Sequence, residues 1–336
     1  GRLLSAHMRQ RGGLITMQDL ADYRAVERSP VEIMYRNVKI ISMGPPSSGG
    51  IVLAQILNQL ELADLSGVEF HSADHIHVMA EAERRAYADR AHYLGDPDFI
   101  NVPVENLTSK AYAARRWADV SEEWASRSED ISRGDIRLLL ESGETTHYSV
   151  ADRWGNAVAV TTTINDLYGS GEVVAGAGFL LNDEMDDFAI KPGYPNMYGL
   201  TGGRSNAIEP GKRMLSSMTP TIVTRNDTLL MIVGSPGGSR IITTVAQIIS
   251  NVVDFGMCIK AAVGAPRLHH QWQPDEIMTE PMAISLETRR RLERMGHKVK
   301  ERPRTIGAAH CIYVDPATGW YFGAADSRRE SGAAGY

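Results

Sequence analysis

The stretch from Glu144 to Asn165 constrains the fold of this chain most, because it joins two β-forming runs by a short turn. Residues 147–151 alternate in polarity, residues 152–156 carry turn-forming side chains, and residues 157–164 are rich in β-branched side chains. This pattern predicts a β-hairpin. Because Thr145 and Thr163 are equidistant from Trp154 in the sequence, the hairpin is expected to place these two threonines opposite each other, with Asn165 just beyond.

A threonine at the head of such a hairpin can be a nucleophile if it is also an N-terminus. A hydroxyl inside a chain reacts poorly, whereas an N-terminal threonine has beside it an α-amine with a reference pKa of roughly 7.7–8.0. That amine can act as general base near neutral pH. We therefore predict that Thr145 is the nucleophile, which requires cleavage of the Glu144–Thr145 bond. The alternative interpretation is that Thr145 and Thr146 only begin a strand.

The composition sets broad limits on size and partners. With 336 residues, 43% of them hydrophobic and 23% charged, the chain can bury the core of one large domain or two. A formal net charge of −6 gives no reason to expect nucleic acid as a partner. Cys258 and Cys311 can form at most one bridge. Because the chain opens with Gly1, inside a predicted helix over residues 2–10, we expect it to be a fragment of a longer protein.

The order of the predicted elements indicates an α+β fold. Helical patterns occupy both halves of the chain, and β-forming runs concentrate in the middle, which favours two stacked sheets with helices outside. Residues 121–144 are charged, rich in Ser, Glu and Asp, and weakly periodic. That composition predicts a flexible, exposed linker ending immediately before Thr145.

An acidic group and a glycine-rich loop follow the hairpin. The acidic group is flanked by apolar residues and consists of Asn182, Asp183, Glu184, Asp186 and Asp187. It is suited to a cationic group such as a substrate amine, with calcium as the weaker alternative because EF-hand spacing is absent. Residues 191–204 form a loop long enough to act as a lid.

A strand, a glycine turn and a helix are predicted around residues 228–255. Free backbone N–H groups and the helix dipole meet at such a turn, so Gly237 and Gly238 can form an oxyanion hole. The loop 44–50 lacks phosphate-loop spacing and is assigned a structural role. The histidines at 71, 75 and 77 have no HExxH pattern, so we expect no metal site and no cofactor.

Three motifs in the same order resemble those of the gamma-glutamyltranspeptidases. They are Thr145–Val150, Met214–Met218 and Gly234–Arg240, and the likeness extends to Met185–Phe188 and the closing Ala-Gly-Tyr. The resemblance implies an N-terminal-nucleophile hydrolase fold, a four-layer αββα sandwich with two stacked antiparallel sheets. It also implies a precursor that cleaves itself. Residues 1–144 then correspond to the C-terminal part of the large subunit, and residues 145–336 to the small catalytic subunit.

The resemblance also implies a role for each matching residue. Thr145 would be the nucleophile, Thr163 its hydrogen-bonding partner, and Gly237 and Gly238 the oxyanion hole. The substrate's α-amino end would be held by Asn165, Glu184 and Asp187. Its α-carboxylate would contact Ser216 and Ser217, together with an arginine from a region of the family that this chain does not contain. Tyr198 corresponds to the tyrosine of the lid.

The implied reaction transfers a gamma-glutamyl group through an ester on Thr145 to water or to an amino acid or peptide amine. Glutathione and similar gamma-glutamyl compounds would be the donors, and a heterodimer of large and small subunits would be the active form. The resemblance places such a protein in the periplasm or outside the cell. The alternatives are a related acylase, acting on cephalosporins, glutaryl groups or poly-gamma-glutamate, and a non-catalytic, unprocessed binding module with the same fold.

Overall fold

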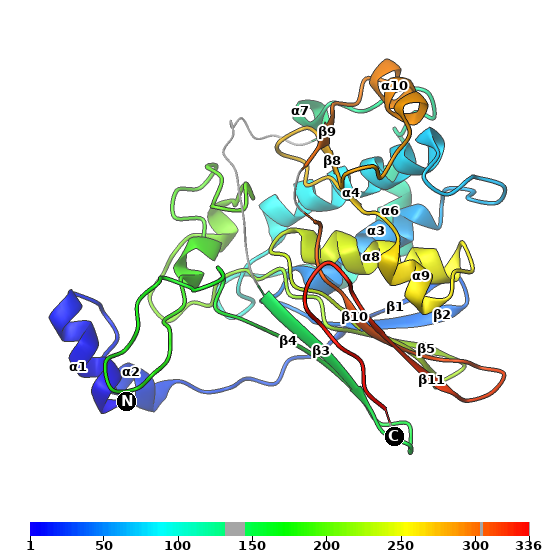
Figure 1. Cartoon of the computed structure of the whole chain (residues 1–336). Coiled ribbons are helices and arrows are strands. Elements are labelled where there is room, and N and C mark those ends of the chain that lie inside the picture. Colours follow the sequence, from blue (N-terminus) through cyan, green and yellow to red (C-terminus); the bar gives the residue numbers. More distant parts are fainter. Residues whose placement is uncertain (132–144, 303–304, 336) are drawn as a thin grey trace.

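The computed structural model describes residues 1–131, 145–302 and 305–335, and Figure 1 shows their arrangement. Glu144 and residues 132–143 of the predicted linker lie outside the described residues. None of the described helices is long and apolar enough to cross a membrane. Cys258 is exposed and Cys311 is buried, and both are free thiols, so the one possible bridge is not formed.

A six-stranded antiparallel sheet is the centre of the molecule, in the order β1-β2-β5-β6-β10-β11. Its strands are β1 (Val31–Tyr35), β2 (Val38–Ser42), β5 (Thr221–Arg225), β6 (Thr228–Gly234), β10 (His310–Val314) and β11 (Tyr321–Ala325). Strand β6 is central and runs almost entirely buried. A small third sheet joins β7 (Leu268–His269), β8 (Ile277–Thr279) and β9 (Val299–Glu301).

The predicted hairpin is the second layer, formed by β3 (Thr145–Ala151) and β4 (Ala157–Thr163). It packs against β6 and β10 of the main sheet. Side chains alternate along β3, so Thr145 and His147 face the main sheet while Thr146 and Tyr148 are exposed. The two layers of antiparallel strands agree with the stacked sheets expected from the sequence.

Helices cover the face of the main sheet that lies opposite the hairpin (Figure 1). The helices of the chain are α1 (Arg2–Arg11), α2 (Met17–Asp22), α3 (Gly49–Leu60), α4 (Ala73–Tyr93), α5 (Val104–Leu107), α6 (Lys110–Trp117), α7 (Ser128–Ile131), α8 (Arg240–Val253), α9 (Ile259–Gly264), α10 (Leu286–Arg294), and the 3₁₀ turns η1 (Glu184–Asp187) and η2 (Arg204–Asn206). All residues of α3 are buried, since it lies between the sheet and α4. This helix-covered core fixes the position of the loops that form the site.

Local sequence signals set several helix ends as expected. Thr16 caps α2 with a reciprocal side-chain and backbone pair to Asp19, and Ser72 caps α4 by accepting from His75 N. Residues 104–120 contain two helices, α5 and α6, with a break between them. The break occurs because Ser109 caps the second helix by accepting from Tyr112 N.

The run 214–220 resembles the start of a strand that continues to Thr224, but β5 begins only at Thr221. Residues 214–219 instead bond to the loop 44–50: Ser216 N donates to Pro46 O at 3.1 Å, and Ser48 N donates to Ser216 O at 2.8 Å. Pro220 lacks an N–H and cannot extend the ladder.

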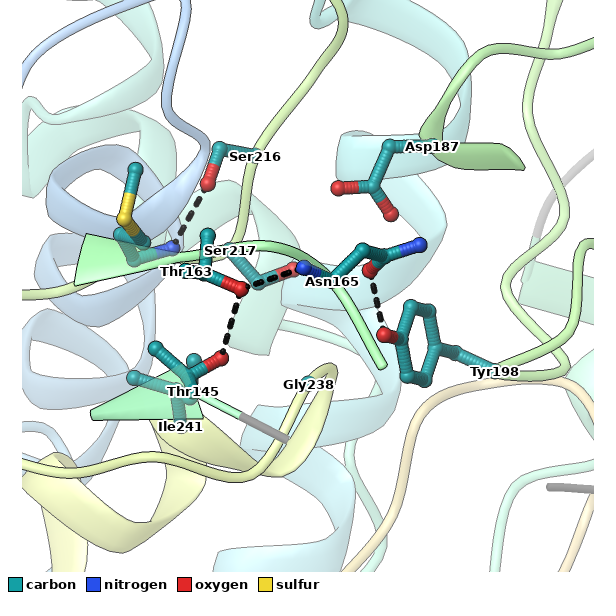
Figure 2. A pocket seen from close by; sticks show the side chains of 10 residues that line it. Thr145, Thr163, Asn165, Asp187, Tyr198, Ser216, Ser217, Gly238 and Ile241 are labelled. Atoms are coloured by element: carbon teal, nitrogen blue, oxygen red, sulfur yellow. Dashed lines mark hydrogen bonds between the residues drawn. The ribbon is translucent and has the colours of Figure 1, made fainter. Parts of the chain in front are cut away.

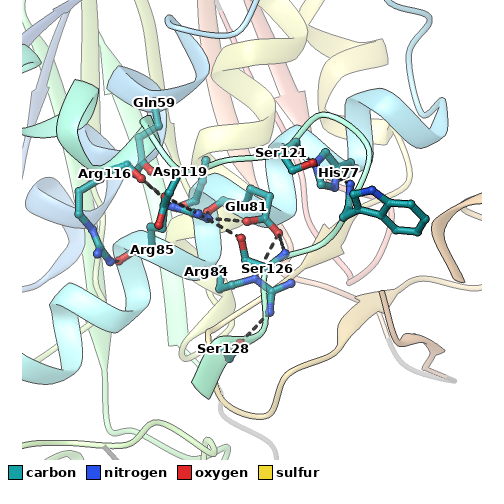
Figure 3. Close-up of polar contacts among 12 residues, drawn as sticks. Gln59, His77, Glu81, Arg84, Arg85, Arg116, Asp119, Ser121, Ser126 and Ser128 are labelled. Atoms are coloured by element: carbon teal, nitrogen blue, oxygen red, sulfur yellow. Dashed lines mark hydrogen bonds and ion pairs between the residues drawn. The ribbon is translucent and has the colours of Figure 1, made fainter. Parts of the chain in front are cut away.

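The flexible linker expected over residues 121–144 is packed in its described part, residues 121–131 (Figure 3). Ser126 N donates to Glu81 Oε1 at 3.1 Å, and Ser121 O accepts from His77 Nε2 at 2.7 Å. Ser128, at the start of α7, is fully buried, and its carbonyl accepts from Trp272 Nε1. These residues thus form hydrogen bonds to buried side chains of α4, while residues 122–124 are exposed.

Candidate active site

The head of the hairpin places Thr145 and Thr163 directly opposite each other, as the sequence predicted. The Thr145 hydroxyl donates to Thr163 Oγ1 at 3.4 Å, and Thr163 Oγ1 also accepts from Asn165 N at 2.8 Å (Figure 2). Against the larger effect of burial, Thr163 also lowers the pKa of the Glu184 carboxyl group. The geometry therefore holds the Thr145 hydroxyl against Thr163 at the head of the hairpin.

His147 holds β3 against the main sheet. Its Nδ1 lies 2.9 Å from Thr161 Oγ1 and its Nε2 lies 3.2 Å from Ser149 Oγ, whose hydroxyl donates to His310 O at 3.0 Å. Because the Ser149 proton is used in that way, His147 Nε2 is the donor to Ser149 and Nδ1 is the acceptor. Burial lowers the pKa of His147 to about 4, so the ring is neutral and fixed two residues from Thr145.

A small cavity of about 20 Å³ lies at the head of the hairpin, which is room for roughly one water molecule. Figure 2 shows the side chains that surround it. It is lined by Thr145, Thr163, Asn165, Asp187, Tyr198, Ser216, Ser217, Met218, Gly238 and Ile241. Two predicted site residues, Glu184 and Gly237, are next to lining residues without lining the cavity themselves. Two lining residues, Met218 and Ile241, were not predicted and are apolar neighbours of the serine pair and the glycine turn.

The acidic group forms one end of the cavity through the 3₁₀ turn η1. Burial, and then the charge of Glu184, raise the pKa of Asp187 to about 8, while Arg90 lowers it. Burial also raises the pKa of Glu184, and Glu184 Oε1 is buried with no hydrogen-bond partner in the described part of the chain. Within the described residues these two carboxyl groups form no salt bridge, so they can receive an ammonium group.

The serine pair forms the other end of the cavity. Ser216 Oγ accepts from Met218 N at 3.1 Å, and Ser217 Oγ accepts from Arg90 Nη2 at 3.1 Å. Neither hydroxyl hydrogen has an acceptor among residues 1–131, 145–302 and 305–335. Both serines can therefore donate to an anionic group in the cavity. No sequence pattern indicated Arg90, which lies 127 residues from Ser217.

The glycine turn between β6 and α8 has the geometry of an anion site. Gly237 has φ +139° and Gly238 has φ +56°, conformations that favour glycine. Within the described ranges, neither backbone N–H has a hydrogen-bond acceptor, and α8 begins directly afterwards, at Arg240. A Cβ on Gly238 would lie 2.7 Å from the Tyr198 ring, so only glycine fits beneath that side chain.

Tyr198 closes the cavity. Its hydroxyl donates to Asn165 Oδ1, and its backbone carbonyl accepts from Gln271 Nε2 at 2.9 Å. The side chain is only 8% exposed. Asn165 itself has φ +75°, a conformation that asparagine tolerates better than most residues, and it turns the chain at the end of β4. Tyr198 and Asn165 thus form one wall of the cavity together.

One group of potential metal ligands lies elsewhere in the described chain, at His77, Glu81 and His297. His77 Nδ1 and His297 Nε2 are 2.8 Å apart and bond to each other. Glu81 is paired with the guanidinium groups of Arg84 and Arg85 (Figure 3). These two positive charges beside the Glu81 carboxylate oppose the binding of a metal cation. We therefore interpret the group as a buried polar network. The network does not include His71 or His75.

Comparison with known proteins agrees with this geometry. The sequence model of the gamma-glutamyltranspeptidase family matches residues 1–336. The glutathione hydrolase proenzyme of Escherichia coli (strain K12) is 50% identical over 325 residues, which are 97% of this chain and 55% of that protein. The acylase ACY 1 proenzyme of Pseudomonas sp. (strain V22) is 39% identical over 317 residues, 94% of this chain and 53% of that protein. The chain thus spans about half the length of the curated relatives it matches.

Solved structures give the same fold, that of N-terminal-nucleophile hydrolases. A mutant of the gamma-glutamyltranspeptidase of Helicobacter pylori matches with a TM-score of 0.54 and 56% identity, covering 55% of this chain and 100% of that chain. The cephalosporin acylase of Bacillus halodurans matches with a TM-score of 0.80 and 28% identity, covering 97% of this chain and 56% of that chain.

Proposed function

The chain belongs to the gamma-glutamyltranspeptidase family, and on this basis we propose that the protein is a self-processing gamma-glutamyltransferase or hydrolase with Thr145 as nucleophile. The observation that carries the proposal is the position of the Thr145 hydroxyl. It lies 3.4 Å from Thr163 Oγ1, at a cavity with carboxylates at one end and two serine hydroxyls at the other. The family membership makes an enzyme of this class the expectation, and the geometry supports the proposed roles.

Self-processing creates the base that catalysis needs. In the first step Thr145 Oγ1 attacks the carbonyl carbon of Glu144, and the C–N bond to Thr145 breaks to give an ester. Water then hydrolyses the ester, which leaves a carboxylate on Glu144 and a free α-amine on Thr145. Residues 1–144 would then be the C-terminal part of a large subunit and residues 145–336 the small subunit of a heterodimer. In support, 55% of this chain matches the whole length of the Helicobacter pylori chain, as expected if the matched part is a separate subunit.

Gamma-glutamyl transfer would follow in two steps. The Thr145 α-amine takes the proton from Oγ1 as this atom attacks the γ-carbonyl carbon of the donor. The N–H groups of Gly237 and Gly238 stabilise the negative oxygen, and the leaving amine departs with the proton. Water or an amino acid or peptide amine then attacks the ester and regenerates Thr145. The Thr163 hydroxyl keeps Thr145 Oγ1 oriented throughout.

The two ends of the cavity suit an amino acid head group. Asp187 and Glu184 can pair with its ammonium, with Asn165 nearby, and Ser216 and Ser217 can donate to its carboxylate. Glutathione is a candidate donor, since the relative in Escherichia coli is named a glutathione hydrolase. We also propose a periplasmic or extracellular location, which rests on the family resemblance alone.

The second candidate is a related acylase, because relatives and structural neighbours include enzymes with that name. The acidic end of the cavity separates the two functions. An acylase for substrates without an α-amine has no use for two carboxyl groups of raised pKa beside the nucleophile. Asp187 therefore favours a donor that carries an ammonium group.

The test uses the protein expressed from its complete gene, with two anilide substrates. We expect γ-glutamyl-p-nitroanilide to be cleaved and glutaryl-p-nitroanilide, which lacks the α-amine, to be cleaved at least about 100-fold more slowly. Thr145→Ala should abolish cleavage, whereas Thr146→Ala, at the exposed neighbouring position, should not. Faster cleavage of the glutaryl compound would favour the acylase function. Retained activity in Thr145→Ala would refute the assigned nucleophile.

A further inference from the structure

Helix α4 carries an arginine whose charge is buried without an acidic partner. Arg90 is 4% exposed, its Nε donates to Ser48 Oγ at 2.9 Å, and its Nη2 donates to Ser217 Oγ at 3.1 Å. Across the described part of the chain, no carboxylate oxygen lies within 4.0 Å of its guanidinium. Arg84 and Arg85 on the same helix differ, because each is paired with Glu81. Burying a guanidinium without a salt bridge costs free energy of folding. A buried charge of this kind is therefore expected to have a function.

The two hydrogen bonds of Arg90 act on the serine pair of the cavity. Because Ser217 Oγ accepts from Arg90, the Ser217 hydroxyl hydrogen stays available to a ligand. Ser48 Oγ accepts from Arg90 and in turn donates to Ser216 O at 2.7 Å. One guanidinium therefore orients the hydroxyl of Ser217 directly and the backbone of Ser216 through Ser48.

The charge of Arg90 also offsets the acidic surplus around the cavity. The groups that face the cavity region from η1 and its approach are Asp183, Glu184, Asp186 and Asp187, all acidic. Arg90 is the cation that acts against them on Asp187. Among the described residues, a carboxylate entering the cavity meets neutral hydroxyl donors beside several acidic groups, and Arg90 adds a positive charge behind those donors.

We propose that Arg90 is a specificity-determining positioning residue, which favours a donor with an α-carboxylate by orienting the serine pair and placing a positive charge behind it. The inference rests on the proposed function, because it presumes that the serine pair receives the donor's carboxylate. Arg90 acts through Ser217 and Ser48, with no need to touch the donor. A residue needed only to fill space could be replaced by methionine without a change in donor preference.

The experiment compares two donors that differ only in the α-carboxylate: γ-glutamyl-p-nitroanilide and 4-aminobutyryl-p-nitroanilide. In the complete protein, Arg90→Met should raise KM for the γ-glutamyl donor about 30-fold, as expected for loss of charge-assisted binding. The value of kcat should change less than about threefold, and KM for the aminobutyryl donor should stay nearly constant. Arg85→Met removes an equally buried guanidinium elsewhere on α4. It should leave the ratio of the two KM values unchanged.

Arg90→Lys covers the case in which the methionine variant does not fold. Lysine keeps the charge but cannot bond both serines as the guanidinium does, so KM should rise about fivefold for the γ-glutamyl donor alone. Equal changes in KM for the two donors, in either Arg90 variant, would overturn the inference. A wild-type protein that cleaves neither anilide would instead contradict the proposed function, and the inference with it.

Discussion

The hydroxyl oxygens of Thr145 and Thr163 lie 3.4 Å apart across the first residue pair of the β3–β4 hairpin. Cross-strand neighbours in an antiparallel pair are fixed by register, and a slip of one residue would turn Thr145 to the exposed face. The threonine pair therefore depends on the whole hairpin and on the layer beneath it.

Thr163→Val tests the dependence of the nucleophile on this partner. Valine keeps the β-branched shape and removes the hydroxyl that accepts from Thr145 and from Asn165 N. We expect kcat to fall about 10- to 100-fold, the range for loss of one hydrogen bond to a reacting or charged group. Initial rates on γ-glutamyl-p-nitroanilide give the measurement. Thr162→Val, at an exposed position of the same strand, is the matched control and should change kcat less than about twofold.

Gly234→Ala tests the support beneath β3. A Cβ at Gly234 would lie 2.2 Å from the His147 ring, so the ring or the strand must shift. Overpacking of this kind costs about 1–3 kcal/mol, and here it also displaces Thr145. Thermal unfolding should show a lower Tm together with slower turnover. Gly264→Ala, where a Cβ meets nothing within 4 Å, should change neither quantity. Unchanged turnover in Gly234→Ala would mean that His147 does not position the nucleophile.

Asp187 predicts a specific pH dependence of donor binding. Because burial and Glu184 raise its pKa to about 8, the carboxyl group is mostly protonated at neutral pH, and an ammonium binds best to its ionised form. When kcat/KM is calculated from the concentration of the donor's ammonium form, it should rise as pH increases from 7 to 9. Asp187→Asn should reduce that rise to the part caused by titration of the Thr145 α-amine, and should lower kcat/KM about 100-fold. Glutaryl-p-nitroanilide should show only this smaller rise. A flat profile in the wild type would contradict the assigned role.

Tyr198→Phe tests the closure of the cavity. The change removes the hydroxyl that donates to Asn165 Oδ1 and leaves the ring over Gly238 in place. We expect kcat/KM to fall about tenfold, as for the loss of one hydrogen bond. We also expect water to capture a larger share of the ester intermediate, because the closed state is less populated. Product analysis with a dipeptide acceptor measures that share. Tyr194→Phe in the same loop, at an exposed ring, should leave it unchanged, and an equal effect of both changes would count against closure by Tyr198.

The hairpin could be predicted from the sequence because all of its information is local. Alternation, turn residues and the equal spacing of Thr145 and Thr163 about Trp154 determine the register within one short stretch. The resemblance to a known family then supplied candidate roles for residues far from the hairpin. The structure brings most of those residues to one cavity, which local patterns alone did not indicate.

Other features depend on contacts between distant segments. The run 214–219 has strand-forming side chains, yet its backbone bonds to the loop 44–50, so no strand forms there. Residues 121–131 have the composition of a mobile linker, but Glu81 and His77, which are buried on α4, form hydrogen bonds with their backbone. Arg90 lies in a helix whose sequence resembles a solvated one. Its burial depends on contacts with α3 and with the loop that carries Ser216 and Ser217. The sequence of the helix alone does not indicate these contacts.

The most direct test of the account is the mass of the protein expressed from its complete gene after incubation at neutral pH. Wild type should yield two fragments, one of which begins with Thr145, while Thr145→Ala should stay intact. Thr146→Ala, the neighbouring control, should be cleaved like the wild type. An intact wild-type chain that nevertheless hydrolyses γ-glutamyl-p-nitroanilide would contradict the account, because the α-amine that serves as base would not exist.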